Sequence, residues 1–246
     1  MNTKYAALFE PAYIGKLKLK NKMAMAPMGP IGYADPHFAF NQRLQDYYVE
    51  RAKGGIGLII TGVCTVNVDV EGIGSPGIPC VTKNPKAFVH NGNQMNERIH
   101  AYGAKIFLQM TANAGRSTMP GMVQNYIAPS VQENRFDPSL LHREMTREEI
   151  RQYTGDFVKG AVIAKRAGFD GVEIHAVHEG YLLDQFAIAL YNHREDEYGG
   201  SLENRLRFAT DIVRGIKQAC GPDFPVSLRF SLKSCMKGLR RGALPG

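Results

Sequence analysis

The chain has 246 residues, of which 44% are hydrophobic and 22% are charged, and its formal net charge is +7 at pH 7. This composition is typical of a globular protein and excludes the disordered, collagen-like and disulfide-scaffold classes. The basic residues are scattered along the chain, whereas a nucleic-acid binder usually concentrates them on one face. No apolar run approaches the roughly 18 residues that a membrane span requires.

The N-terminal residues contain no apolar stretch typical of a secretory signal. The four cysteines, Cys64, Cys80, Cys220 and Cys235, stand far apart, and none forms a Cys-x-x-Cys pair. Isolated thiols suit a reducing compartment and disfavour a zinc or iron–sulfur site in this chain. We therefore expect a cytoplasmic protein with no metal site, no nucleic-acid partner and no membrane segment.

Short apolar runs alternate with segments of helical periodicity along the chain. The apolar runs predict buried strands over residues 23–28, 56–61, 104–110, 171–175 and 225–230. Helices are predicted after the capping residue Asn41, over residues 85–102, from the capping box Thr146-Arg-Glu-Glu149 to Gly168, and from about residue 206 to Gly221. Residues 13–19 predict a small hairpin ahead of the first long strand. Strand–helix–strand alternation indicates a parallel sheet with right-handed crossovers.

Two α/β architectures accept this alternation, an open doubly wound sheet and a TIM (β/α)8 barrel. No Gly-x-Gly-x-x-Gly follows the first strand, which disfavours the dinucleotide-binding form of the open sheet. In a barrel, the active site lies at the carboxyl ends of the strands. The polar residues at the predicted strand ends are therefore the candidates for function.

Two of these candidates lie within predicted strands. A buried amide such as Gln109 needs a hydrogen-bond partner. One interpretation is a structural partner, namely a neighbouring strand or water. The other is a bound heterocycle with matching donors and acceptors. The Arg229 guanidinium either pairs with a structural carboxylate such as Glu173 on the adjacent strand, or places a fixed positive charge where an anion develops.

A denser cluster follows the fourth strand. His175 and His178 stand three residues apart and are followed by Tyr181. Imidazoles can hold a carbonyl oxygen, and a nearby tyrosine hydroxyl can deliver a proton. The chain has no nucleophile elbow and no His-Glu-x-x-His motif, which disfavours a hydrolase. None of the predicted strands ends in a lysine, which disfavours an aldolase.

Three further segments stand out between the predicted elements. Residues 192–205 are crowded with charge, and we expect them to form a structural ion-pair network that orders a loop. Residues 62–84 and 111–145 exceed the usual length of a structureless loop, which predicts lids or binding loops.

These motifs make the sequence recognisable, and they cover nearly the whole chain in order. The strongest runs from Val172-Glu-Ile-His175 through Ala-Val-His178-Glu-Gly-Tyr181 to Phe186, and the other matching pieces lie at residues 8–11, 20–28, 48–55, 107–110, 115–116, 196–205 and 227–229. The sequence resembles the Old Yellow Enzyme family of FMN-dependent ene reductases. Within that family it is most similar to the NADH-linked branch of the 2-enoate and 2,4-dienoyl-CoA reductases.

The resemblance implies a TIM barrel that holds FMN at its C-terminal mouth. Gln109 would bond the pyrimidine edge of the flavin, and Arg229 would lie beside N1 and O2. The backbone contacts to the flavin would come from Ala26, Pro27, Met28, Gly29, Gly62 and Val63. Many relatives carry Thr or Cys where this chain has Gly29.

The resemblance also implies a reaction, the reduction of the activated C=C bond of an unsaturated carboxylate, thioester or ketone. Reduced flavin would transfer a hydride to the alkene, and NADH would then recharge the flavin. His175 and His178 match the pair that binds the substrate carbonyl, and Tyr181 matches the proton donor. Glu179 is an extra residue relative to the classical motif, so either His178 or Glu179 could face the substrate. Arg116 is a candidate substrate selector.

Family barrels have eight strands, whereas five are predicted here, and residues 231–246 resemble a loop. We therefore expect residues 1–246 to form the N-terminal part of one FMN-binding barrel domain, truncated after about five strands. The loops that hold the FMN phosphate, and the 4Fe–4S and FAD sites of the branch, would lie in a missing C-terminal part. An open arc of strands invites pairing with another chain. The alternative is therefore an inactive fragment, or a half-barrel that needs a partner chain or a second copy to bind flavin.

Overall fold

The computed structural model describes residues 3–29, 32, 34–73, 77–178 and 181–232. The expectations for Glu179, Cys235 and residues 233–246 therefore lie outside the described residues. None of the described helices is both long and apolar enough to cross a lipid bilayer.

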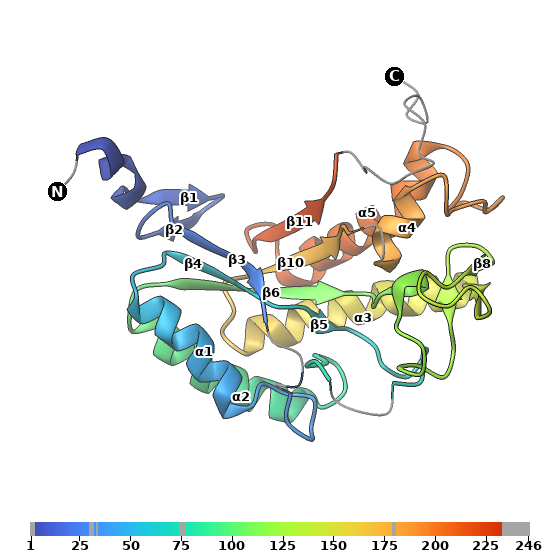
Figure 1. Cartoon of the computed structure of the whole chain (residues 1–246). Helices are drawn as coiled ribbons and strands as arrows, with labels where there is room; N and C mark the ends of the chain where they lie inside the picture. Colours follow the sequence, from blue (N-terminus) through green and yellow to red (C-terminus); the bar gives the residue numbers. More distant parts are fainter. Residues whose placement is uncertain (1–2, 30–31, 33, 74–76, 179–180, 233–246) are drawn as a thin grey trace.

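A parallel sheet runs through the centre of the molecule (Figure 1). Its strands lie side by side in the same order as in the chain. They are β3 (Ala24–Met28), β4 (Leu58–Thr61), β6 (Lys105–Thr111), β10 (Gly171–Ala176) and β11 (Val226–Phe230). The short β5 (Cys64–Thr65) extends the sheet beside β6. A doubly wound sheet would reverse its strand order at a switch point, whereas a (β/α)8 barrel keeps the chain order. The predicted arc of five barrel strands is confirmed for the described chain.

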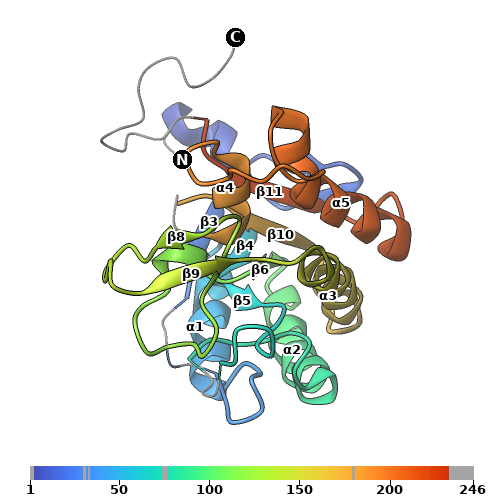
Figure 2. The same ribbon diagram turned by 90° about the vertical axis from the view of Figure 1, so that its right-hand side faces the viewer.

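Each pair of neighbouring strands is joined by a helix that packs on one face of the sheet (Figure 2). These helices are α1 (Gln42–Lys53), α2 (Pro85–His100), α3 (Arg147–Arg166) and α5 (Leu202–Cys220). Their starts follow the expected capping chemistry. The Asn41 side chain accepts the Leu44 N–H at 3.0 Å, and Thr146 and Glu149 form the predicted capping box.

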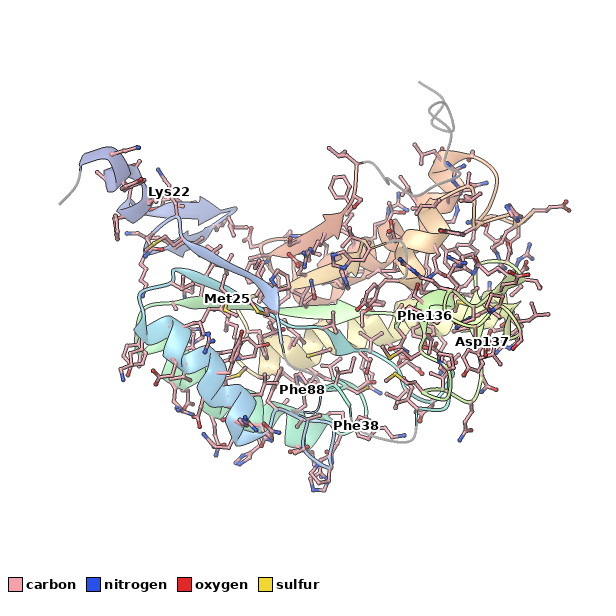
Figure 3. All side chains as sticks on the ribbon, viewed as in Figure 1. Lys22, Met25, Phe38, Phe88, Phe136 and Asp137 are labelled. Atoms are coloured by element: carbon pink, nitrogen blue, oxygen red, sulfur yellow. The ribbon has the colours of Figure 1, made fainter. Side chains whose placement is uncertain are left out.

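The main core lies between the helices and the sheet. Alternate residues of the strands, such as Ile106 and Ile174, face this core together with aromatic side chains such as Phe157. Phe88 belongs to the core and Met25 packs against it, and Figure 3 labels both side chains. The opposite, inner face of the sheet therefore carries the residues in between, including Phe107, Gln109, Glu173 and His175.

The inner face is closed at the amino ends of the strands. The 3-10 helix η1 (Thr3–Phe9) is followed by the antiparallel hairpin of β1 (Ala12–Ile14) and β2 (Leu17–Leu19), as the sequence predicts. Leu19 at the end of β2 packs with Leu58 and Phe107 in a small apolar cluster. Among the described residues, this cluster covers the inner face at the amino ends of the strands and leaves their carboxyl ends open to a ligand.

The expected ion-pair network in residues 192–205 is confirmed. The Arg194 side chain is buried, donates to Asp196 at 2.6 Å, and also donates to the carbonyl oxygens of Pro129 and Met145 at 3.0 and 2.7 Å. It thereby ties the segment after α4 (Leu182–Ala187) to the segment that precedes α3. Because the guanidinium is buried and fully engaged, this arrangement is structural.

Several short elements were not predicted. They are η2 (Gly115–Ser117), α4, and a small sheet of β7 (Ile127–Ala128), β8 (Gln132–Glu133) and β9 (Leu141–Glu144). Each is too short to produce a hydrophobic period in the sequence. Tertiary contacts define them instead: the buried His142 ring bonds the Ile127 carbonyl oxygen at 3.1 Å and the Asn134 amide at 3.0 Å.

Candidate active site

The loops after β3 and β4 are joined by one buried hydroxyl. The Tyr48 hydroxyl accepts the Gly62 N–H at 2.7 Å and donates to the Met28 carbonyl oxygen at 3.1 Å. Burial raises the pKa of Tyr48, so the hydroxyl stays protonated. Gly29 and Gly62 touch through their backbones, because a Cβ atom on Gly62 would lie 2.5 Å from the Gly29 Cα. The strand ends therefore form a rigid surface of main chain.

The residues expected to contact a cofactor here lie around this surface. Ala26 and Met28 are exposed on β3, and Pro27 is partly exposed between them. Gly29, Gly62 and Val63 line a cavity beside the strand ends. The structure therefore brings together the backbone segments that the sequence assigned to one binding surface.

Gln109 makes the neighbouring-strand contact that was one of its two interpretations. Its Nε2 donates to Glu173 Oε1 at 2.8 Å, and Ser227 donates to the other oxygen of Glu173 at 3.1 Å. The strand register places these three residues side by side across β6, β10 and β11. No described residue donates a hydrogen bond to the side-chain Oε1 of Gln109, which leaves an acceptor for a ligand N–H.

Of the two interpretations of Arg229, the pairing with Glu173 is wrong. Glu173 is engaged by Gln109 and Ser227, and the register sets Arg229 opposite His175 instead. Among the described residues no carboxylate pairs with Arg229. Its charge nevertheless affects its neighbours, since Arg229 contributes to lowering the pKa values of both His175 and His178. The guanidinium is therefore a fixed positive charge at the carboxyl end of β11.

His175, His178 and Tyr181 form one cluster. Their ring centroids lie 5.0 Å apart for the two histidines, 4.3 Å for His175 and Tyr181, and 6.0 Å for His178 and Tyr181. His178 adopts a left-handed backbone with φ of +74°, which turns the chain from β10 towards Tyr181. The sequence prediction that these residues act together is compatible with this geometry.

The protonation states suit hydrogen-bond donation to a neutral oxygen. Burial, with the nearby charges of His178 and Arg229, lowers the pKa of His175 to about 3, so its ring is neutral at pH 7. A neutral imidazole has one N–H donor and one acceptor nitrogen. Burial raises the pKa of Tyr181, so its hydroxyl keeps its proton. The buried His175 Nδ1 has no partner among the described residues.

A cavity of about 380 Å³ opens beside this cluster. Tyr181 and Asn113 lie on its wall, and the remaining lining is mostly apolar. The apolar side chains are Phe38 (labelled in Figure 3), Phe40, Leu44, Val63, Val68, Ile73, Ile78, Pro79, Met119, Met122 and Val123. Both long segments, residues 62–84 and 111–145, contribute to this lining, as expected of binding loops; their action as lids stays a prediction.

Arg116 lies close to the cavity but is not among its lining residues. Its guanidinium stacks on the Tyr191 ring, 4.9 Å from the centroid, and contacts the Tyr191 hydroxyl at 3.4 Å. The Arg116 N–H donates to Gln185 at 3.1 Å. A direct role for Arg116 in selecting the substrate stays a prediction, and it would require the side chain to leave Tyr191.

The residues of the site fit a flat heterocycle such as the FMN ring. Among the described residues, the inner face offers an amide acceptor at Gln109, a positive charge without an ion-pair partner at Arg229, and an unpartnered ring nitrogen at His175. The described residues contain no group of three His, Cys, Asp or Glu side chains placed to hold a metal ion. The strand order defines this fold as the front part of a TIM barrel, an architecture whose sites lie at the carboxyl ends of its strands.

Comparison with known proteins identifies the family. The NADH:flavin oxidoreductase / NADH oxidase family matches residues 7–241, and the chain belongs to this family. A cinnamate reductase of Clostridium sporogenes is 56% identical over the whole chain, which covers 37% of that protein. An NADH oxidase of Thermoanaerobacter brockii is 40% identical over 96% of the chain, which covers 36% of that protein.

Solved structures agree with this assignment. The Old Yellow Enzyme homologue of Zymomonas mobilis superimposes with a TM-score of 0.77 at 32% identity, over 91% of this chain and 63% of the other. Morphinone reductase in complex with tetrahydroNAD superimposes with a TM-score of 0.76 at 30% identity, again over 91% of this chain and 63% of the other. The resemblance to the Old Yellow Enzyme family is confirmed. The chain spans about a third of the two longer relatives and under two thirds of these two structures.

The sequence did not reveal the roles of Tyr48 and Asn113. Tyr48 lies on the buried face of α1, but its hydroxyl contacts depend on how β3 and β4 meet. Asn113 follows β6 with a left-handed φ of +64°. An asparagine directly after a predicted strand was the only signal available, because Asn tolerates this conformation better than most residues.

Proposed function

We propose that the chain carries the flavin-facing and substrate-facing part of an FMN-dependent ene reductase. The observation that carries this proposal is the cluster of His175, Tyr181 and Arg229 at the carboxyl ends of β10 and β11, in which Tyr181 also lines an apolar cavity. Membership of the NADH:flavin oxidoreductase family supports an oxidoreductase with a flavin cofactor.

The inner face would hold the cofactor through few side chains. Gln109 Oε1 would accept from an N–H of the pyrimidine ring, and Arg229 would stabilise negative charge at its N1–O2 edge. The joined main chain of Gly29 and Gly62 would support the ring. When bound and reduced, FMN supplies the hydride, and NADH would restore its reduced form.

The cluster would orient and protonate the substrate. Neutral His175, together with His178, would donate hydrogen bonds to the substrate carbonyl oxygen and so polarise the C=C bond. The alkene β-carbon accepts the hydride, and the Tyr181 hydroxyl gives its proton to the α-carbon. Solvent then returns a proton to the Tyr181 oxygen. The hydride brings two electrons and one proton, and Tyr181 brings the second proton, which together balance the reduction of C=C to CH–CH; the solvent proton restores Tyr181.

The cavity supports a substrate with an apolar substituent. Its lining contains no lysine, arginine, aspartate or glutamate. Removing a phenyl-sized apolar group from water into such a lining contributes favourably, at roughly 25 cal/mol per Å². The name of the relative from Clostridium sporogenes, a cinnamate reductase, points in the same direction. We therefore favour an aryl- or alkyl-substituted unsaturated carboxylate over the corresponding thioester or ketone.

A second candidate function is that of a half-barrel that binds flavin only with further strands. β3 and β11 each have one unpaired edge in the described sheet, and Met28 and Phe230 are both 58% exposed on them. Unpaired strand edges favour pairing with another chain. The additional strands could come from a second copy or from the larger part of the protein that the longer relatives possess. Any 4Fe–4S cluster or FAD would belong to that part.

One experiment separates the two candidates. The purified chain is mixed with FMN and desalted, and its visible spectrum and its mass in solution are recorded. Retained flavin absorbance on a monomer supports the first candidate. A flavin-bound dimer supports the second, and a colourless protein would overturn flavin binding by the chain alone.

The role of Tyr181 has its own test in the flavin-loaded protein. Tyr181→Phe is expected to slow alkene reduction and to leave flavin reduction by NADH unchanged, because only alkene reduction consumes the phenolic proton. Equal loss of both half-reactions would remove Tyr181 from the role of proton donor.

A further inference from the structure

Glu71 is a buried acid that the proposed reaction does not use. It lies in the loop between β5 and α2 and is 1% exposed. One carboxylate oxygen accepts from the Asn113 side chain and from the Tyr153 hydroxyl, the latter at 3.1 Å. The other oxygen is buried without a partner among the described residues.

The groups that face Glu71 do not neutralise it. Tyr153 on α3 and Asn113 after β6 are its side-chain partners, and no described cation forms an ion pair with it. Of the nearest charged groups, Asp156 on α3 binds the Asn67 amide, and Asp69 pairs with Lys83 at 2.5 Å. Burial raises the pKa of Glu71 to about 7, against the opposing effect of its hydrogen bonds.

Asn113 connects Glu71 to the candidate proton donor. Its side chain binds the Glu71 carboxylate, while its own carbonyl oxygen accepts the N–H of Leu182 at 3.2 Å. Leu182 directly follows Tyr181 and begins α4. With φ at +64°, Asn113 needs its surroundings to hold the left-handed conformation that aims this carbonyl group.

Glu71 also joins the two long loops around the cavity. Its main-chain carbonyl oxygen accepts the N–H groups of Gln124 and Asn125 at 2.9 and 3.0 Å. One residue of the loop after β5 thus contacts the loop after β6 through its main chain and reaches the start of α4 through Asn113. A carboxylate is costly in such a place, because burial removes its charge from water. An amide or an apolar side chain would fill the same space without that cost.

We propose that Glu71 is a positioning residue, whose carboxyl group holds Asn113 in the conformation that fixes the start of α4 and hence the Tyr181 hydroxyl at the cavity. The catalytic part of the proposal rests on the proposed function, in which Tyr181 is the proton donor. Its structural part concerns the Asn113–Leu182 hydrogen bond and is independent of that assignment.

The structural part is tested by hydrogen–deuterium exchange of the Leu182 amide in the chain itself. Glu71→Ala is expected to raise exchange at residues 182–187 by about tenfold, which corresponds to the loss of one net hydrogen bond. Asp170→Asn is the matched control, because Asp170 is a partly buried, hydrogen-bonded acid near the opposite end of β6. The control should leave residues 182–187 unchanged. Unchanged exchange in Glu71→Ala would overturn the proposal.

If Glu71→Ala does not fold, Glu71→Gln carries the same test. Glutamine keeps an oxygen that can accept from Asn113 and Tyr153, but it cannot ionise. Leu182 exchange, corrected for its intrinsic pH dependence, should change across the Glu71 pKa of about 7 in the natural chain and stay constant in Glu71→Gln. The same pH dependence in both proteins would overturn the proposal.

The catalytic part uses a double-mutant cycle in the flavin-loaded protein. Glu71→Ala should slow alkene reduction about tenfold with flavin reduction by NADH unchanged, and should have no further effect in a Tyr181→Phe background. Additive effects would overturn the link between Glu71 and Tyr181. If Tyr181→Phe alone has no effect, the proposed function fails, while the exchange measurements still decide the structural part.

Discussion

The Tyr48 hydroxyl offers the sharpest test of how the strand ends are held together. Tyr48→Phe removes one oxygen atom from a side chain that is 1% exposed and leaves its ring in place. The Gly62 N–H and the Met28 carbonyl group, bonded to that oxygen at 2.7 and 3.1 Å, both lose their partner. A buried polar group left unpaired costs about 1–3 kcal/mol, so the two together predict a loss of about 2–6 kcal/mol.

The assay is urea unfolding of the natural chain and of two variants. Tyr47→Phe is the matched control, because Tyr47 is the next residue on α1 and its ring stacks under Arg51 at 3.6 Å without a hydrogen bond from its hydroxyl among the described residues. We expect Tyr47→Phe to change the free energy of unfolding by less than about 0.5 kcal/mol. FMN affinity should fall in Tyr48→Phe and not in Tyr47→Phe. Equal stability of the two variants would refute the reasoning.

Three further predictions concern other parts of the sheet. Hydrogen bonds from His100 and the Ile106 N–H lower the pKa of Asp170, although its partial burial acts to raise it. The contribution of Asp170 to stability is therefore present above about pH 4 and is lost as the pH falls. Asp170→Asn should remove this pH-dependent loss of stability in urea unfolding. Gly62→Ala should destabilise the fold and weaken FMN binding, since a Cβ atom at Gly62 would lie 2.5 Å from backbone atoms. Gly155→Ala in α3 is the contrasting variant, because a Cβ atom at Gly155 has no neighbour within 4 Å. It should stabilise the chain by about 1 kcal/mol in thermal unfolding. The raised pKa of Glu71, about 7 when folded, predicts that its contribution to stability declines as the pH rises from about 4.5 through 7, and that Glu71→Gln abolishes this decline.

Local signals predicted the scaffold of the barrel well. Asn41, the capping box at Thr146 and the glycines after the helices act within one or two turns, so the sequence contains all the information they need. The apolar runs also predicted buried strands, and β6 and β10 are buried along nearly their whole length.

The contacts across strands were less predictable. Arg229 and Glu173 lie on neighbouring strands and on the same face, which made an ion pair plausible. The register sets Glu173 opposite Ser227 and Gln109, so Arg229 is a diagonal neighbour, and diagonal positions are roughly 7–8 Å apart between Cα atoms. A shift of two residues, invisible in the sequence, decides whether this guanidinium is paired.

The Glu71 contacts were beyond sequence reasoning for a different physical reason. Glu71 and Tyr153 are 82 residues apart and belong to a loop and a helix that meet only in the folded chain. No periodicity or capping pattern marks an acid in a long loop as buried. Asn113 was equally unpredictable, because it contacts Glu71 through its side chain and the Leu182 N–H through its main-chain carbonyl oxygen.

The central claim is that the inner face of the sheet, at the carboxyl ends of its strands, binds the flavin ring. An NMR titration of the isotope-labelled chain with FMN tests this directly, even where binding is weak. We predict shifts of the Gln109 side-chain amide, the Arg229 guanidinium and the Gly29 and Gly62 amides, with no shift at Leu19 or Leu58 at the opposite end. Shifts confined to the helical surface, or none at saturating FMN, would contradict the account.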